Sequence, residues 1–356
     1  MIKRENQKVA ILDRSKELIR NQKYFQAEEL LKSLPVSKIS DSKILELLGI
    51  SALYQNKFDQ ARQYLNDAQA LQPQSAEIYY YQGKLFERQG KYQESVNNYQ
   101  KAIQLKKDYF EAYFSLGNVL RKVGKKELAL NSYNIALNIN SSRPEIYLNI
   151  GVTLEEEEQL QPAINIFQKL VNKFPDYLEG YNKLGICLKK SGFFEQAEQI
   201  FKTGLERDAN YVRFYGNLGN VLQSQGKFQE ALKLYNQAID MEPRYYEAIF
   251  SRSLLYLLMG KFEKGWQDYE YRWKLSGLNM KNFDFPIWNG QNLDKKSLLL
   301  WSEQGFGDSI QFIRYASLIK EDADQLICAC QPSLDELFAS IPEIDKIVDA
   351  NQATVQ

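Results

Sequence analysis

The sequence predicts a mostly α-helical solenoid that is followed by a small α/β lobe with a short parallel sheet. Two observations lead to this fold class. Small side chains recur at an interval of 34 residues through most of the chain, and segments typical of strands and helices alternate after residue 297. An interval between about 20 and 50 residues is typical of arrays in which each repeat is one supersecondary unit.

The repeats begin at residues 8, 42, 76, 110, 144, 178, 212 and 246, and no insertion interrupts their spacing. The eighth place of the repeat is small: Ser15, Gly49, Gly83, Gly117, Gly151, Gly185, Gly219 and Ser253. The twentieth place is also small: Ala27, Ala61, Ser95, Ala129, Ala163, Ala197, Ala231 and Gly265. The twenty-fourth place is bulky: Leu31, Leu65, Tyr99, Tyr133, Phe167, Phe201, Tyr235 and Tyr269. Two small positions let paired helices approach closely while the bulky side chain fills the adjoining gap, so each repeat is predicted to be a helical hairpin.

The turn inside each hairpin needs a residue that can end a helix in the left-handed conformation. Five repeats place a glycine there, namely Gly90, Gly124, Gly192, Gly226 and Gly260. Asn56 is a tolerated substitute, whereas Gln22 and Glu158 depart from the pattern.

These residues resemble the tetratricopeptide repeat, over roughly residues 8 to 274. The resemblance implies a right-handed superhelix whose first helices line a concave groove for a protein or peptide ligand. The first repeat has no glycine at its signature places and is predicted to be an N-terminal cap. The sixth and ninth places of the first helices supply the predicted groove residues: Tyr81, Lys84, Ser115, Asn118, Asn149, Lys183, Asn217 and Asn220. Asn149 and Asn217 also match part of the asparagine ladder of the similar array in protein O-GlcNAc transferases. The alternative is that these asparagines are ordinary solvated surface residues.

A column of glutamates occupies the second place of several repeats: Glu77, Glu111, Glu145, Glu179 and Glu247. Such a column can attract a basic ligand. A carboxylate in the first turn of a helix is also favourable by ~0.3 to 1 kcal/mol, and we favour this structural explanation.

The chain changes character after residue 274. Trp266, Tyr269, Glu270 and Trp273 form a stripe that needs a covering surface, and residues 275–297 are predicted to be an ordered connector because they hold several aromatic residues. Strands are predicted at residues 297–301, 325–330 and 346–350, with helices at 309–321 and 333–341 between them. This alternation predicts a parallel sheet. Cys328 and Cys330 share one face of the second strand and are expected to be packed thiols.

The motifs YEYRWK, PIWNGQNL, LLLWSEQGFGDSIQFIRY and CQPSLDELFASIPEID resemble bacterial tetratricopeptide-repeat glycosyltransferases, whose catalytic region is of the two-lobed GT-B type and related to heptosyltransferases. The resemblance implies that Asp308 is a candidate general base, with Glu303, Gln304, Gly305 and Gly307 in the acceptor-binding turn. The alternative for Asp308 is an ordinary helix N-cap. The turn lacks the third glycine of a dinucleotide-binding fingerprint.

The resulting domain prediction is a superhelix at 1–274, the connector at 275–297 and an incomplete Rossmann-like lobe at 298–356. A doubly wound lobe needs on the order of 150 residues, so the donor lobe is predicted to be missing. Two functions remain open. The chain is either the front part of a sugar transferase, which uses a nucleotide sugar only if the missing lobe is present, or a peptide-binding scaffold whose α/β tail is a docking cap.

Composition excludes several classes of function. The chain has 45 Lys and Arg against 45 Asp and Glu, so we expect no nucleic-acid partner. Histidine is absent, which excludes His-based catalysis, and the three cysteines are too few and too poorly spaced for a zinc site. We expect no metal and no cofactor. Without an apolar run long enough for a signal peptide or membrane span, the chain is predicted to be cytoplasmic.

Overall fold

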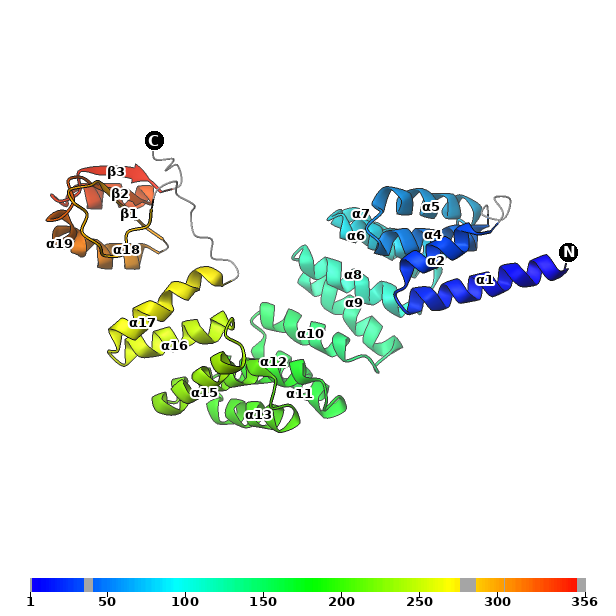
Figure 1. Cartoon of the computed structure of the whole chain (residues 1–356). Helices are drawn as coiled ribbons and strands as arrows, with labels where there is room; N and C mark the ends of the chain where they lie inside the picture. The colour runs from blue at the N-terminus through cyan, green and yellow to red at the C-terminus, as the bar shows by residue number, and fades with distance from the viewer. Residues whose placement is uncertain (1, 35–40, 276–285, 304, 351–356) are drawn as a thin grey trace. The chain divides into compact units, whose positions relative to one another are not determined.

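The structure is a computed structural model that describes residues 2–34, 41–275, 286–303 and 305–350 of the chain. It consists of two compact units, Met1–Leu278 and Asn279–Gln356. The first unit is helical and the second contains the parallel sheet (Figure 1). The predicted fold class is therefore confirmed.

The helical unit is an array of antiparallel hairpins, each made of a first and a second helix. The pairs are α1 (Ile2–Arg20) with α2 (Tyr24–Lys32), α4 (Ser42–Tyr54) with α5 (Phe58–Leu71), α6 (Ala76–Arg88) with α7 (Tyr92–Leu105), α8 (Phe110–Lys122) with α9 (Lys126–Ile139), α10 (Pro144–Glu156) with α11 (Leu160–Lys173), α12 (Leu178–Lys190) with α13 (Phe194–Arg207), α14 (Val212–Ser224) with α15 (Phe228–Met241), and α16 (Tyr246–Leu258) with α17 (Phe262–Tyr269). From α4 to α15 every first helix has 13 residues and every second helix 14. The two ends of the array deviate, because α1 is longer and α17 passes into the 3-10 helix η1 (Glu270–Lys274).

The small places of the repeat face each other as the sequence predicts. The Ser95 hydroxyl, at the twentieth place, donates to the carbonyl of Gly83, at the eighth place, over 2.9 Å. A Cβ added to Gly117 would lie 2.5 Å from Cε1 of Tyr133, which is fully buried. The aromatic ring therefore fills the space that a side chain at the eighth place would need.

The turns inside the hairpins share one backbone conformation even where the residue differs. Gly124 has a φ of 77°, and Gln22 and Glu158, which depart from the glycine pattern, both have a φ of 59°. After Glu158, the amide of Gln159 donates to the carbonyl of Leu154 over 2.9 Å, a bond that closes the helix end. The geometry of the turn is thus imposed by the packed helices, and a non-glycine residue is accepted there.

The first helices lie on the inner side of the array. Consecutive first helices pack directly on each other, as α10 does with both α8 and α12. A second helix instead packs against its own first helix and the first helix of the next hairpin, as α11 does with α10 and α12. Because the first helices are closer together, the array curves around them, and the first helices form its inner face.

The second unit contains three parallel strands, β1 (Leu298–Trp301), β2 (Leu326–Cys330) and β3 (Lys346–Asp349), in the order β1-β2-β3. Short helices connect them: α18 (Phe306–Phe312), η2 (Ile313–Tyr315) and α19 (Ala316–Lys320) before β2, and η3 (Pro332–Leu334) and α20 (Asp335–Ala339) before β3. Leu298 pairs with Leu326, and Ile327 pairs with Lys346. The predicted helix at 309–321 therefore begins three residues earlier and is broken into three pieces.

The core of the second unit lies between the sheet and these helices. Cys328 and Cys330 are buried in one cluster with Leu334 and Phe338, so the expectation of packed thiols is confirmed. Burial raises the pKa of the Cys330 thiol to about 12, and the carboxylate of Asp335 beside it acts in the same direction. These thiols are therefore held in the unreactive protonated form.

Candidate functional site on the inner face of the array

Two of the predicted groove residues, Asn118 and Asn149, bond to each other across neighbouring first helices. Asn149 Nδ2 of α10 donates to Asn118 Oδ1 of α8 over 2.7 Å, and Tyr133 Oη donates to the same oxygen over 2.7 Å. An amide oxygen has two lone pairs, so both are occupied. The amide nitrogen of Asn118 makes no hydrogen bond within the described part of the chain, and it is left as a donor on a half-buried surface.

A second amide contact links α12 and α14. Asn217 Nδ2 donates to Asn182 Oδ1 over 2.7 Å, and Asn182 is buried. Asn220 Oδ1 accepts from Tyr235 Oη over 2.8 Å. Asn182 is absent from the predicted site because it stands at the fifth place of its repeat. The signal in the sequence that could have identified it is the recurrence of asparagine near the sixth place.

The remaining predicted groove residues are engaged differently. Lys84 Nζ lies 3.1 Å from Glu87 Oε2, and Lys183 Nζ lies 3.9 Å from Glu155 Oε2. Tyr81 packs edge to face on Tyr80, with the ring centres 5.0 Å apart. Ser115 is buried, so it offers less to a ligand than its place in the repeat predicts.

Tyrosine hydroxyls connect the core of the hairpins to the inner face. The ring of Tyr99 is fully buried, yet its hydroxyl donates to Glu87 Oε2 over 2.7 Å. Burial raises the pKa of Tyr99 far above its ordinary value, and the charge of Glu87 adds to the effect. These phenols therefore remain protonated donors that fix the orientation of the polar groups above them.

Two carboxylates clamp neighbouring hairpins together at equivalent places. Glu28 is 1% exposed and accepts from Lys57 Nζ over 2.8 Å, from Gln55 Nε2 over 2.7 Å and from Lys32 Nζ over 2.5 Å. Burial alone would raise the pKa of Glu28, but these three donors outweigh it and lower the pKa to about 2. The residues stand at the twenty-first and twenty-fifth places of one repeat and the fourteenth and sixteenth of the next.

The same constellation recurs between α13 and α15. Glu198 accepts from Lys202 Nζ over 2.6 Å and from Lys227 Nζ over 3.2 Å. The hydrogen bond from Lys202, together with those from Lys227 and Gln225, lowers the pKa of Glu198 to about 2. Both clamps are structural, since their charges are satisfied internally.

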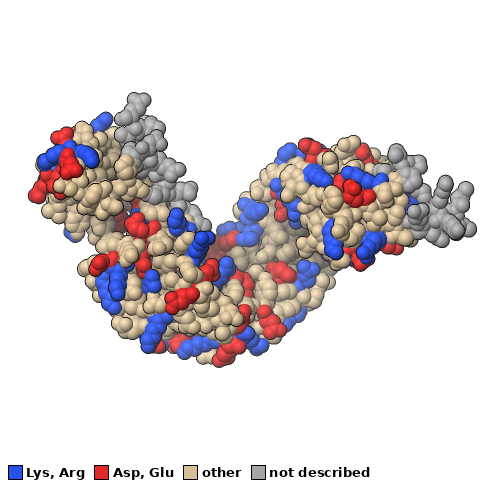
Figure 2. Space-filling view, viewed as in Figure 1, with Lys and Arg blue, Asp and Glu red and all other residues tan. Residues whose placement is uncertain are grey.

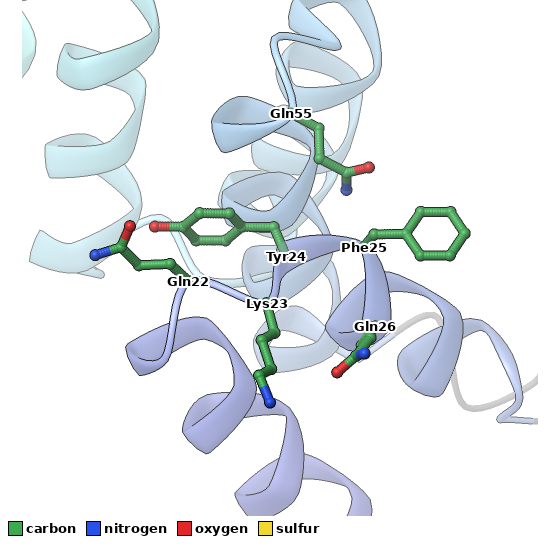
Figure 3. Close-up of a pocket in the computed structure, with 6 residues that line it drawn as sticks. All are labelled: Gln22, Lys23, Tyr24, Phe25, Gln26 and Gln55. Atoms are coloured by element: carbon green, nitrogen blue, oxygen red, sulfur yellow. The ribbon is translucent and has the colours of Figure 1, made fainter.

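A shallow pocket lies at the other end of the array, where the α1–α2 turn meets the end of α4. It is lined by Gln22, Lys23, Tyr24, Phe25, Gln26 and Gln55. Figure 3 shows the rings of Tyr24 and Phe25 pointing away from each other. Tyr24 stacks on Tyr54 at 4.7 Å, and Gln55 is bonded to the Glu28 clamp. The pocket contains none of the predicted groove residues.

The glycine turn of the second unit follows the carboxyl end of β1. Gly305 has a φ of 74° and is the N-cap of α18, and Asp308 is the third residue of that helix. The alternative interpretation of Asp308 as the N-cap is therefore wrong, because the helix starts before it and Gly305 occupies the N-cap position. Asp308 and Gly307 are exposed and Glu303 is half-buried, while Gln304 lies outside the described residues.

Two further expectations concern membrane-spanning helices and the distribution of charge on the surface. No described helix combines the length and the apolar character that crossing a bilayer requires. Figure 2 shows cationic and anionic residues interspersed on the visible face of the molecule.

Within the predicted connector, residues 276–285 lie outside the described part, and Trp288 Nε1 donates to the carbonyl of Gln291 over 2.6 Å.

Comparisons with known proteins agree with this geometry. Residues 83–124 and 117–158 match the family model described as TPR repeat, and residues 145–177 and 212–245 match models described as tetratricopeptide repeat. The C-terminal part of a TPR repeat-containing protein from Cytophaga hutchinsonii is similar in fold, with a TM-score of 0.56 and 15% identity over 67% of this chain and 98% of that one. The TPR protein YrrB, described as having an unusual peptide-binding site, has a TM-score of 0.45 and 22% identity over 53% of this chain and 97% of that one.

A curated relative shares a shorter stretch. Protein FlbA of Caulobacter vibrioides is 35% identical over 65 residues, which are 18% of this chain and 11% of that protein. This chain thus spans a small part of that relative's length. Taken with the 34-residue hairpins and the packing of the small places, the family-model matches show that the helical unit is a solenoid of tetratricopeptide repeats.

Proposed function

We propose that the helical array is a protein-interaction scaffold that binds an extended segment of a partner protein along its inner face. The observation that supports this most is two pairs of hydrogen-bonded amide side chains, one joining α8 and α10 and one joining α12 and α14, together with the buried tyrosines that bond to Asn118 and Asn220. Because these bonds fix each amide, the inner face is organised before a ligand arrives. An extended segment offers the backbone carbonyl groups that such donors require.

A selection from a displayed library of random twelve-residue peptides tests this proposal. Selected peptides are expected to lose at least tenfold in affinity for Asn118→Ala and Asn217→Ala, since each change removes an oriented amide. Asn98→Ala is the matched control, because Asn98 is half-buried like Asn118 but lies on the second helix α7, where its amide donates to the carbonyl of Glu94. Peptides that lose affinity equally for all three variants would show that binding occurs elsewhere.

We further propose that the second unit is the beginning of a glycosyltransferase region, with Asp308 as general base. Two observations favour it: the sheet is parallel, and the exposed Asp308 lies in the first turn of α18, the helix that follows β1. Ligands of open parallel sheets bind at the carboxyl ends of the strands. Gly305, Gly307, Glu303 and Gln304 would then lie beside the acceptor, and a nucleotide sugar would need a second lobe. The alternative function is a scaffold in which this unit is a docking cap.

Reading the coding sequence past residue 356 separates these two functions. A second α/β lobe encoded there supports the transferase, whereas a stop codon supports the scaffold. In a polypeptide that contains both lobes, Asp308→Asn is expected to lower kcat by about 10²- to 10⁴-fold if Asp308 is the base. Unchanged kcat would remove Asp308 from the mechanism.

A further inference from the structure

Charge pairs join neighbouring first helices between the twelfth place of one hairpin and the thirteenth place of the next. Arg121 Nη1 of α8 lies 2.6 Å from Glu156 Oε1 of α10. Glu155 Oε1 of α10 in turn lies 2.5 Å from Lys190 Nζ of α12. At both junctions the inner face therefore supplies its own counter-charge.

This succession stops at the junction of α12 and α14. Lys189 occupies the twelfth place of α12, but the thirteenth place of α14 is Ser224. The hydroxyl of Ser224 donates to the carbonyl of Asn220 over 3.0 Å and carries no charge. Lys189 makes no hydrogen bond or ion pair with any residue that the structure describes.

The core below Lys189 offers no polar partner either. In two other hairpins a tyrosine at the twenty-fourth place reaches the residue at the twelfth place: Tyr99 bonds to Glu87, and Tyr235 bonds to Gln223. The hairpin of Lys189 has Phe201 at that place, which has no hydroxyl group and is fully buried. Lys189 is consequently half-buried and has no partner among the described residues, and burial lowers its pKa.

We propose that Lys189 binds a carboxylate side chain of the partner segment, so that the scaffold selects ligands with an Asp or Glu at this point of the groove. A carboxylate from the ligand would complete the pairing that Arg121 and Glu155 obtain within the array. A partly desolvated ammonium group gains more from a counter-charge than an exposed one does. This inference rests on the proposed function, because it concerns the same inner face.

The test selects displayed random twelve-residue peptides on the full chain and measures their affinity for three variants. Lys189→Gln removes the cation. Ser224→Glu supplies an internal carboxylate at the thirteenth place, as Glu156 does for Arg121. Lys233→Gln is the matched control, since Lys233 is an exposed lysine on the second helix α15.

Selected peptides are expected to share one acidic position. Their affinity should fall about tenfold to a hundredfold for Lys189→Gln and for Ser224→Glu, and stay unchanged for Lys233→Gln. Replacing the acidic residue by its amide should cost the same in the wild type and nothing further in Lys189→Gln. Ser224→Glu should also raise the unfolding temperature slightly, which shows that this variant is folded.

Two results would overturn the inference. Peptides that bind the inner face without an acidic position, or that bind Lys189→Gln as tightly as the wild type, refute the role of Lys189 and leave the scaffold function standing. Failure to select any peptide that depends on Asn118 or Asn217 refutes the scaffold function, and the inference with it.

Discussion

The helical array and the α/β unit solve the packing problem in different ways. In five hairpins of the array, from α6 to α15, one contact is repeated: an aromatic ring occupies the space above a glycine, as Phe167 does above Gly151. The α/β unit has no such repetition. Its core is assembled once, around β2, and several apolar side chains of its helices remain exposed, among them Phe306, Ile310 and Leu318. Repetition thus buries a ring by the same contact in successive hairpins, whereas the core of the α/β unit depends on contacts that occur only once.

The largest expected effect is the loss of a buried ring, which should destabilise only the unit that contains it. Phe167→Ala and Phe338→Ala each remove a ring that is at most 1% exposed, and each should cost about 3 to 5 kcal/mol of stability. Hydrogen exchange in urea should show lost protection in the array for Phe167→Ala and in residues 298–349 for Phe338→Ala. The comparison breaks down if Phe338→Ala destabilises the array to the same extent.

Replacing a glycine by alanine should change the stability of the two units in opposite directions, and by less than the loss of a buried ring does. Gly151→Ala would put a Cβ 2.4 Å from Cε1 of Phe167, so the buried ring must move, at a cost of about 1 to 3 kcal/mol. Gly307→Ala in α18 meets no atom within 4 Å and should stabilise by about 0.5 to 1 kcal/mol. Urea unfolding followed by circular dichroism and tryptophan fluorescence measures both changes. Equal destabilisation would show that Gly307 is packed as closely as Gly151.

The ion pairs of the two units should also respond differently to acid. The pKa of Glu28 is lowered to about 2 from an ordinary value of 4.5, so its clamp contributes stability on the order of 3 kcal/mol above about pH 4.5. This contribution should be lost as the pH falls toward 2. Glu28→Gln should therefore be much less stable than the wild type at pH 7 and nearly as stable near pH 2, as measured by thermal unfolding of the array.

The control lies in the α/β unit. Asp345 and Lys320 pair over 2.6 Å on the surface, and the hydrogen bond from Lys320 lowers the pKa of Asp345. Because salt screens exposed charges, the effect of Asp345→Asn should be smaller and should vanish in 1 M NaCl, while the effect of Glu28→Gln should persist. An equal salt dependence of both variants would contradict the burial of the Glu28 clamp.

Much of the array can be predicted from the sequence because one steric rule recurs. The eighth, twentieth and twenty-fourth places identify which helices pair and which side chain fills the gap, as Gly117 and Tyr133 illustrate. Gln22 and Glu158 depart from the glycine pattern of the sequence, yet both residues adopt the left-handed backbone. A local glycine preference is weaker than the packing of the two helices that the turn joins, so the turns are alike even where the residue differs.

The candidate site was less predictable, because its contacts join residues that are far apart in the sequence. Asn118 and Asn149 were predicted from their places in the repeat, but the role of Tyr133 in orienting Asn118 depends on side-chain geometry. The Glu28 and Glu198 clamps were missed, although glutamate at the twenty-first place and lysine at the sixteenth place of the next repeat is a pattern that the sequence contains. The start of α18 was misplaced because Gly305, and not Asp308, provides the sharp turn before it.

The charge pairs at the twelfth and thirteenth places also make similar hairpins non-interchangeable. By shape alone, the hairpins that start at residues 144 and 178 could exchange positions, since their helices have equal lengths. The exchange would bring Arg121 against Lys190 in place of Glu156, so two cations would meet. Electrostatic repulsion thus favours one stacking order of hairpins whose helix lengths are the same.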